Sequence, residues 1–234
     1  MIPSCYTTSF TGAPVVKGWS DHHFFEFLRH PDYGLCLFLD GILQSSEADQ
    51  DIYHEKLVRA ALEEQQSPSD ILIIGGTGGG ALHQVRRALG GLQCRVTIVD
   101  IDEKLFCIGR DLMQKWRNGE LQNPAVNVIY ANGSEFLKVT NKKFDVIILD
   151  VGDPLPCTKS NDIYAPSVLK DIGRVLRPDG VVSFHSAPEH TLDHVFVRES
   201  LEGNDSLRKV SHFRTTIPSF ERPWMFNTLK KHAL

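Results

Sequence analysis

The sequence lacks long hydrophobic runs. Its purely aliphatic stretches, such as Val146–Leu149, fall far short of the roughly 20 apolar residues that a membrane-spanning helix needs. The first residues, MIPSCYTTSF, contain no basic segment ahead of an apolar core, which a secretion signal would have. We therefore expect a soluble, cytoplasmic protein that has no membrane partner.

Paired cysteines and a surplus of basic residues are also missing. The 5 cysteines are odd in number and form no Cys-x-x-Cys pair, which favours reduced thiols over a disulfide framework or a zinc site. Lys and Arg total 25 against 29 for Asp and Glu, so the formal net charge is -4. This balance argues against a nucleic-acid partner and is compatible with a cationic small substrate. We expect no metal site.

The composition is that of a folded chain. Its 18 glycines and 12 prolines are too few for a collagen-like or low-complexity protein. With 41% apolar and 23% charged residues, the 234 residues are typical of one globular domain with room for a small appendage.

From residue 70 onward, short aliphatic runs alternate with helix-length amphipathic segments, which predicts an α/β fold with a parallel sheet. The predicted strands are Ile71–Ile74, Val96–Val99, Val126–Tyr130, Phe144–Leu149 and Val181–Phe184, and the predicted helices cover 81–89, 103–117, 165–176 and 191–202. Because these strands are apolar, we expect them to be buried on both faces. Two later runs, Val210–Thr216 and Trp224–Leu229, predict a final antiparallel pair.

The pattern differs before residue 70. Phe24–Leu28 and Leu35–Leu39 are predicted strands, the dipeptide Asp40-Gly41 is a predicted hairpin turn, and 49–62 is a predicted helix. We therefore expect a small β-strand region over residues 1–48 and an α/β domain over residues 49–234.

A glycine-rich loop, Gly75–Gly80, follows the first strand of this α/β domain. Glycines let the backbone approach a ligand closely, and the helix that begins near Ala81 offers N–H groups at its N-terminus. Gly76, Gly78 and Ala81 match the GxGxxA spacing of dinucleotide-binding enzymes. The loop therefore fits a nicotinamide dinucleotide or an adenosyl sulfonium equally well.

Polar residues follow three further strands. Asp100 closes the second strand, where either class of ligand would place a ribose hydroxyl, whereas Asp102 is better explained as a helix N-cap. Asn132 and Gly133 follow the third strand, and Asp150 follows the fourth. Because the carboxyl ends of parallel strands converge on one crevice, we expect these residues to face the same ligand.

Asp150 and Asp153 place two carboxylates in the loop that leaves a buried strand. A carboxylate at the mouth of an apolar sheet is costly unless it is paired or used, so a functional role is favoured for Asp150. Asp153 precedes a proline, and an ordinary turn explains it equally well. Two acids suit an amine nucleophile, because one can hold the ammonium and the other can accept its proton.

These motifs, in this order, resemble those of the spermidine synthases, the polyamine aminopropyltransferases. The resembling segments are YGLCLFLDGILQSSE (33–47) with Tyr53-His54-Glu55, IIGGTGGG (73–80), VDID (99–102), DVIILD (145–150) with Asp153-Pro154, and IPSF (217–220) with Trp224 and Phe226. The resemblance implies a Rossmann-like class I methyltransferase fold behind a small N-terminal β-hairpin domain. It also implies decarboxylated S-adenosylmethionine as co-substrate with no prosthetic group, a small-molecule diamine as acceptor, and a homodimer.

The resemblance also implies roles for individual residues. Asp150 would be the base that deprotonates the attacking amine, Asp153 its partner on the acceptor side, and Tyr53 a residue at the junction of acceptor and donor. His54 would lie at the same junction, although its pattern also fits a half-exposed helix residue. The implied donor-binding residues are His54, Gly76, Gly78, Asp100, Asn132 and Gly133, with Asp100 on the ribose and Asn132-Gly133 on the adenine.

The sequence departs from the family pattern at several polar positions. Gly78 replaces an Asp that meets the terminal ammonium of the donor, and Phe220 replaces a Tyr that reaches the acceptor. Asn132 replaces an Asp that accepts from the adenine amino group, which an amide oxygen can still do. His185 lies near a position usually given to Gln, and His23 lies where the family often has a nucleoside-binding Gln.

Three alternatives therefore stay open beside an aminopropyltransferase. One is a methyltransferase that uses intact S-adenosylmethionine, because Gly78 removes a carboxylate that would repel that donor's own carboxylate. Another is a catalytically degenerate paralogue that binds a nucleoside or a partner subunit. A nicotinamide dehydrogenase is supported only by the GxGxxA spacing.

Overall fold

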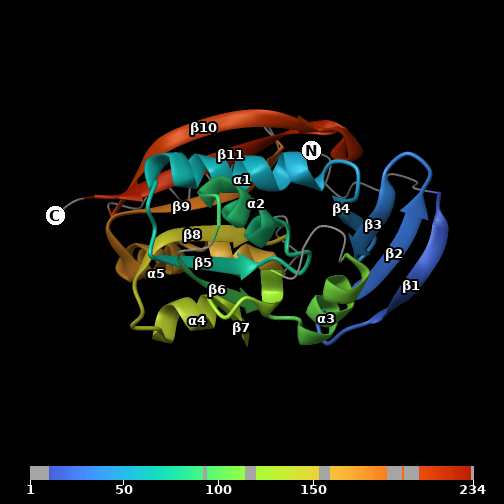
Figure 1. The fold of residues 1–234 in the computed structure, drawn as a ribbon, viewed down its shortest axis with the longest axis horizontal. Coiled ribbons are helices and arrows are strands. Elements are labelled where there is room, and N and C mark those ends of the chain that lie inside the picture. Colours follow the sequence, from blue (N-terminus) through green and yellow to red (C-terminus); the bar gives the residue numbers. More distant parts are fainter. Residues whose placement is uncertain are drawn as a thin grey trace.

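The computed structural model describes residues 11–91, 94–113, 120–152, 159–188 and 206–232, together with Val197. This part of the chain forms a four-stranded sheet and a seven-stranded sheet with helices packed on it (Figure 1). No helix in these ranges is long and apolar enough to cross a membrane.

The four-stranded sheet is antiparallel and follows the chain order β1-β2-β3-β4. Its strands are β1 (Ala13–Trp19), β2 (Phe24–His30), β3 (Gly34–Leu39) and β4 (Ile42–Ser46). The predicted turn between β3 and β4 is confirmed. Asp40 and Gly41 have positive φ values of 51° and 81°, as a two-residue hairpin loop with a type I′ turn requires. The sequence does not predict β1, whose residues are almost all exposed and show no alternation of apolar and polar side chains.

The seven-stranded sheet has the order β10-β11-β9-β8-β5-β6-β7. Its strands are β5 (Asp70–Gly75), β6 (Arg95–Asp100), β7 (Val126–Tyr130), β8 (Phe144–Asp150), β9 (Leu176–Pro188), β10 (Leu207–Ile217) and β11 (Arg222–Lys231). Strands β5 to β9 pair in parallel, and β10 and β11 extend the sheet as an antiparallel pair next to β9. The predicted parallel sheet with a final antiparallel pair is confirmed.

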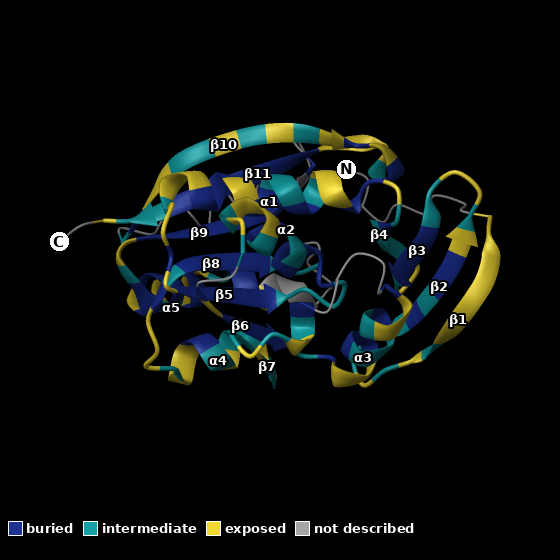
Figure 2. Cartoon of the chain, in the orientation of Figure 1, coloured by how far each residue is buried: buried dark blue, intermediate teal, exposed yellow. Residues whose placement is uncertain are grey.

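Burial on both faces holds for the central strands only. The ribbons of β5 and β8 are coloured as buried along most of their length (Figure 2). Their successive residues alternate between two buried apolar clusters, which lie on opposite faces because side chains alternate along a strand. The expectation of burial is wrong for β7, where residues are half-buried or exposed and Tyr130 keeps 40% of its surface exposed. The reason is position, because β7 is the last strand at its end of the sheet and has one neighbour, β6.

Helices cover both faces of this sheet. They are α1 (Gln50–Glu64), α2 (Gly80–Leu89), α3 (Glu103–Leu112), α4 (Gly133–Val139) and α5 (Pro166–Val175). The predicted helices at 49–62, 81–89 and 165–176 are confirmed within a few residues, and 103–117 is confirmed as far as Leu112. The short α4 is not predicted, and the predicted helix at 191–202 falls outside the described residues except for Val197.

The N-terminal sheet packs against α3. Phe25 and Phe27 of β2 and Leu37 of β3 form an apolar cluster with Leu105 and Met113 from the α3 segment. This contact places the N-terminal sheet beside the carboxyl ends of β5 and β6 (Figure 1). Helix α3 lies between the sheet and these strand ends. The division into units over 1–48 and 49–234 stays a prediction.

A buried carboxylate joins four strands at the opposite, amino-terminal edge of the sheet. Asp70 is 2% exposed and accepts hydrogen bonds from Arg95 at 2.8 and 2.7 Å and from Arg177 at 2.7 Å. Arg177 also donates to Asp145 at 2.7 Å. The hydrogen bond from Arg95 outweighs burial and, with Arg177, lowers the pKa of Asp70.

We expect Asp70→Asn to lower the free energy of unfolding by about 1–3 kcal/mol at neutral pH. This loss is smaller than the loss for a fully buried ion pair, because both arginines are partly exposed. Because folding lowers the pKa of Asp70, its contribution is complete above the unfolded pKa of about 3.9 and is lost as the pH falls through the folded value. Urea denaturation of both proteins at several pH values measures this. The exposed Asp32 provides a control variant, Asp32→Asn, and an equal loss there would contradict the prediction.

Candidate active site

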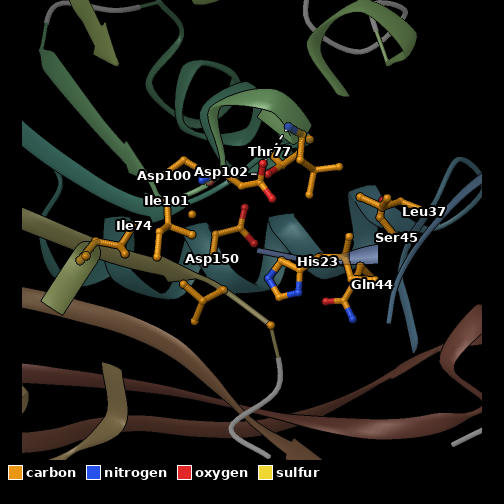
Figure 3. Close-up of a pocket in the computed structure, with 18 of the residues that line it drawn as sticks. His23, Leu37, Gln44, Ser45, Ile74, Thr77, Asp100, Ile101, Asp102 and Asp150 are labelled. Carbon is orange, nitrogen blue, oxygen red and sulfur yellow. Dashed lines mark hydrogen bonds between the residues drawn. The ribbon is translucent and has the colours of Figure 1, made fainter. Parts of the chain in front are cut away.

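One pocket lies between the carboxyl ends of the parallel strands and the N-terminal sheet. Asp150 stands at its centre, with Thr77, Asp100 and Asp102 on one side and His23 and Gln44 on the other (Figure 3). Among the residues that line it are eight of the nine predicted site residues: Tyr53, His54, Gly76, Gly78, Asp100, Asn132, Gly133 and Asp150. The ninth, Asp153, lies outside the described residues. Their roles stay predictions.

The glycine loop is shaped by its contact with β8. Gly75 and Gly76 have φ values of 83° and 94°, in the positive-φ region that favours glycine. Gly76 N donates to the Asp150 carbonyl at 3.1 Å, and a Cβ on Gly75 would overlap that same carbonyl oxygen. Gly78 is different, because among the described residues an added Cβ there would meet only the Met113 side chain, at 3.7 and 3.9 Å. These residues therefore leave room for a Cβ at position 78.

Asp100 is a buried and oriented carboxylate at the end of β6. It is 5% exposed and accepts from Asp102 N at 2.9 Å and from the Thr77 hydroxyl at 3.0 Å. Burial raises the pKa of its carboxyl group. The prediction that Asp102 is a helix N-cap is confirmed, since its side chain accepts from Leu105 N at 2.9 Å at the start of α3. It also accepts from the Ser20 hydroxyl, which ties the loop after β1 to this helix.

His54 lies against Asp150. The His54 Nδ1 is 2.8 Å from the Gln50 carbonyl oxygen, which can only accept, so Nδ1 carries a hydrogen. The His54 Nε2 is 3.4 Å from Asp150 Oδ2. Burial disfavours the charged ring, but the charge and hydrogen bond of Asp150 outweigh it and raise the pKa of His54. The alternative of a half-exposed helix residue is wrong, because His54 is 7% exposed and its ring fills the space that a Cβ on Gly80 would occupy.

Aromatic side chains form the wall of the pocket next to His54. Tyr53 contacts the rings of His185 and Phe220 at centroid distances of 5.8 and 6.2 Å, and Trp224 contacts the same two rings at 5.2 and 5.0 Å. His185 is fully enclosed, and burial lowers its pKa. Its neutral ring donates through Nε2 to the Val151 carbonyl at 2.9 Å. We call Tyr53, His185, Phe220 and Trp224 the aromatic wall.

Asn132 occupies the N-cap of α4. Its Oδ1 accepts from Ser134 N at 2.9 Å and from Glu135 N at 3.1 Å. The amide oxygen that was expected to accept from an adenine amino group is therefore already engaged. The next residue, Gly133, packs so closely on Ile74 that a Cβ would overlap the isoleucine side chain.

Three of the pocket-lining residues that the predicted site residues omit are Thr77, His185 and Trp224. Thr77 interrupts the glycine run, and that interruption was its only signal in the sequence. His185 directly follows the predicted strand Val181–Phe184, so the rule of polar strand ends could have found it. Trp224 comes from the antiparallel strand β11, and its signal in the sequence was the family resemblance of IPSF (217–220) with Trp224.

Comparison with known proteins matches this chain to a protein family. The family described as "Spermine/spermidine synthase domain" matches residues 50–234. A polyamine aminopropyltransferase from Sulfolobus acidocaldarius is 33% identical over 196 residues, which cover 83% of this chain and 64% of the relative. Polyamine aminopropyltransferase 2 from Pseudomonas aeruginosa is 32% identical over 198 residues, which cover 83% of this chain and 56% of the relative. The chain thus spans less than two thirds of the length of these relatives.

Solved structures share the fold. A spermidine synthase in complex with the transition-state analogue AdoDATO superposes with a TM-score of 0.84 at 22% identity, over 95% of this chain and 75% of that chain. The spermidine synthase from Thermotoga maritima superposes with a TM-score of 0.77 at 24% identity, over 95% of this chain and 73% of that chain. The expected methyltransferase-like α/β fold with an N-terminal β-sheet is confirmed.

We expect the pKa of His54 in the folded protein to lie above the ordinary value of about 6.5, and Asp150→Asn to lower it. The variant removes the carboxylate that raises the pKa and leaves the burial that lowers it. The stabilisation from this pair is therefore complete below the unfolded pKa and is lost as the pH rises through the folded pKa. NMR titration of the imidazole nitrogens measures the shift. The same pKa in wild type and variant would show that the two side chains do not interact.

Proposed function

Because the chain belongs to the spermine/spermidine synthase family, we propose that it transfers an aminopropyl group from decarboxylated S-adenosylmethionine to a small-molecule amine. The observation that carries this proposal is the contact between His54 and Asp150. It places a carboxylate where the polar half of the pocket, formed by the glycine loop and the strand ends, meets the aromatic wall.

The donor would occupy the side of the pocket formed by the glycine loop and the strand ends. The buried Asp100 is held by Thr77 and by the backbone, so its carboxylate is oriented before a ribose hydroxyl arrives. Gly76, Asn132 and Gly133 lie on the same side. The complex of a structurally similar spermidine synthase with the transition-state analogue AdoDATO supports an adenosyl donor of this kind.

The reaction would be an in-line displacement. A neutral amine attacks the methylene carbon bonded to the sulfonium, the new N–C bond forms as the C–S bond breaks, and a neutral thioether leaves. An alkylammonium resembles Lys, with a pKa of about 10.4, so removing its proton near pH 7.4 costs about 3 pKa units, or ~4 kcal/mol. Asp150 would accept this proton as a general base. Because no oxyanion forms, positioning of the two substrates contributes more than stabilisation of new charge.

His54 would hold Asp150 in place for this step. Its ring is fixed by the Gln50 carbonyl on one side and faces Asp150 Oδ2 on the other. Rotation of the carboxylate away from the pocket would break this contact and leave a buried charge without its partner, which is costly.

The acceptor would lie along the aromatic wall. Its alkyl chain can pack on Tyr53, Phe220 and Trp224, and the faces of these rings attract an ammonium group. Tyr53 would line the junction at which the amine meets the donor. We assign Asp153 to the acceptor ammonium on the basis of the family resemblance.

A methyltransferase that uses intact S-adenosylmethionine is the second candidate. The observation that favours it is Gly78, which presents no carboxylate to the tail of the donor although an added Cβ there would make only ordinary contact with Met113 among the described residues. A degenerate nucleoside-binding paralogue is less well supported, because the His54–Asp150 contact has no use in nucleoside binding alone. The family resemblance also supports a cytoplasmic location and a homodimer. Light scattering after size-exclusion chromatography would test the homodimer.

The test of the proposed activity is aminopropyl transfer from decarboxylated S-adenosylmethionine to a panel of diamines. We expect Asp150→Asn to lower turnover by about 10²–10⁴-fold, the usual contribution of a general base. Affinity for 5′-methylthioadenosine should stay within about threefold, because the variant keeps the shape of the side chain. The exposed Asp32→Asn variant is the control. Wild-type rates in Asp150→Asn would show that Asp150 is structural.

We expect Gly78→Asp to tighten binding of decarboxylated S-adenosylmethionine by about 10–100-fold without tightening the intact donor. A charge-assisted hydrogen bond to the terminal ammonium contributes roughly 1.5–3 kcal/mol, which corresponds to that range. For the intact donor, repulsion of its carboxylate offsets this gain. Gly78→Asn adds the same volume without the charge and serves as the control. Calorimetry with both donors measures the two affinities, and unchanged selectivity would place Gly78 away from the donor's tail.

A further inference from the structure

Asp49 is a buried carboxylate that takes no part in the proposed reaction. It is 3% exposed and stands at the N-cap of α1, where an aspartate ordinarily accepts from backbone N–H groups of the first helical turn. Its side chain makes no such bond. Oδ2 accepts from Ser219 N at 2.6 Å, and Oδ1 accepts from the hydroxyls of Ser219 at 2.9 Å and Ser46 at 2.7 Å. The carboxylate is therefore directed at a segment 170 residues away along the chain.

Ser219 is the middle residue of the turn Pro218–Phe220, which connects β10 to β11. The residue after the turn, Glu221, has a φ of 58°, a conformation that residues other than glycine adopt only where the surrounding structure holds it. Ser219 is 1% exposed, and both its backbone N–H and its hydroxyl are bonded to Asp49. The next residue, Phe220, belongs to the aromatic wall. The hydrogen bonds to Asp49 therefore fix the turn directly beside a ring that lines the pocket.

The same aspartate joins the two segments that bring Tyr53 and Phe220 together. Its backbone carbonyl accepts from Tyr53 N at 3.4 Å within α1, and its side chain holds Ser219. The rings of Tyr53 and Phe220 face each other at a centroid distance of 6.2 Å. Neither Asp49 nor Ser219 is among the described residues that line the pocket. Both residues therefore act from behind the aromatic wall.

We propose that Asp49 is a positioning residue for the acceptor amine, because its hydrogen bonds to Ser219 set the place of Phe220 opposite Tyr53. This inference rests on the proposed function, which puts the acceptor along the aromatic wall. A wall that is held in place before the ligand arrives avoids the cost of ordering it on binding. The donor side of the pocket is built by the glycine loop and the strand ends, so we expect donor affinity to be independent of Asp49.

The contacts of Asp49 offer variants that separate positioning from stability. Asp49→Ala removes all three hydrogen bonds without removing a side-chain helix cap. Asp49→Asn can rebuild them, because its oxygen can accept from Ser219 N while its NH₂ group donates to the two hydroxyls. Ser219→Ala and Ser46→Ala each remove one hydroxyl that donates to the same oxygen, Oδ1. Ser46 lies in β4 and outside the turn, so Ser46→Ala is the matched control.

The experiment measures two affinities of each protein by isothermal titration calorimetry. One is the affinity for 5′-methylthioadenosine, and the other is the affinity of the protein saturated with it for 1,3-diaminopropane, 1,4-diaminobutane and 1,5-diaminopentane. We expect Asp49→Ala to weaken binding of the tightest diamine by about tenfold or more, because hydrogen bonds to a charged group are lost, and to weaken 5′-methylthioadenosine by less than about threefold.

Two further results distinguish positioning from a general structural role. Asp49→Asn should restore the diamine affinity to within about threefold of wild type, and Ser219→Ala should weaken it more than Ser46→Ala does. In the transfer assay of Asp49→Ala, the KM for that diamine should rise, whereas kcat should change by less than about threefold.

The outcomes separate this inference from the proposed function. An equal loss of affinity for the diamine and for 5′-methylthioadenosine in Asp49→Ala would overturn the role of Asp49 and leave the proposed function standing. So would unchanged diamine affinity in that variant, or equal effects of Ser219→Ala and Ser46→Ala. If Asp49→Ala does not fold, the two serine variants decide. A wild type that binds 5′-methylthioadenosine but neither binds nor alkylates a diamine would overturn the proposed function and this inference together.

Discussion

The contact between His54 and Asp150 sets the geometry of the whole site. It joins the first helix of the α/β domain to the carboxyl end of β8, two segments that are far apart in the sequence. Two glycines are required by the packing around it: a Cβ at Gly80 would overlap the His54 ring, and one at Gly75 would overlap the Asp150 carbonyl. The strand end, the helix and the glycine loop therefore pack together around a single carboxylate.

This packing changes how the glycine loop should be interpreted. Gly75, Gly80 and, beyond the loop, Gly133 each have a neighbouring protein atom where a side chain would be, so the fold alone accounts for them. Gly78 has no such neighbour closer than 3.7 Å. It is therefore the glycine at which selection by a ligand, rather than by packing, is the better explanation.

The two halves of the pocket differ in physical character, and each half comes from a different part of the fold. The strand-end half is polar, and its side chains are already held by hydrogen bonds, as Asp100 and Asn132 show. The other half is the aromatic wall, which draws Tyr53 from α1 and Trp224 from the antiparallel extension of the sheet. The polar strand-end half suits a nucleoside and the aromatic wall suits a cationic alkyl amine, and Asp150 lies where the two halves meet.

The sequence by itself determined the parallel sheet, the helices α1, α2, α3 and α5, and the polar strand ends at Asp100, Asn132 and Asp150, because apolar periodicity and turn residues act over a few neighbouring positions. Only the tertiary structure decided that β7 is half-exposed and that His54 is buried against Asp150. These properties depend on which surfaces meet after folding. Burial and the pKa of a side chain follow from neighbours that are brought together from distant segments.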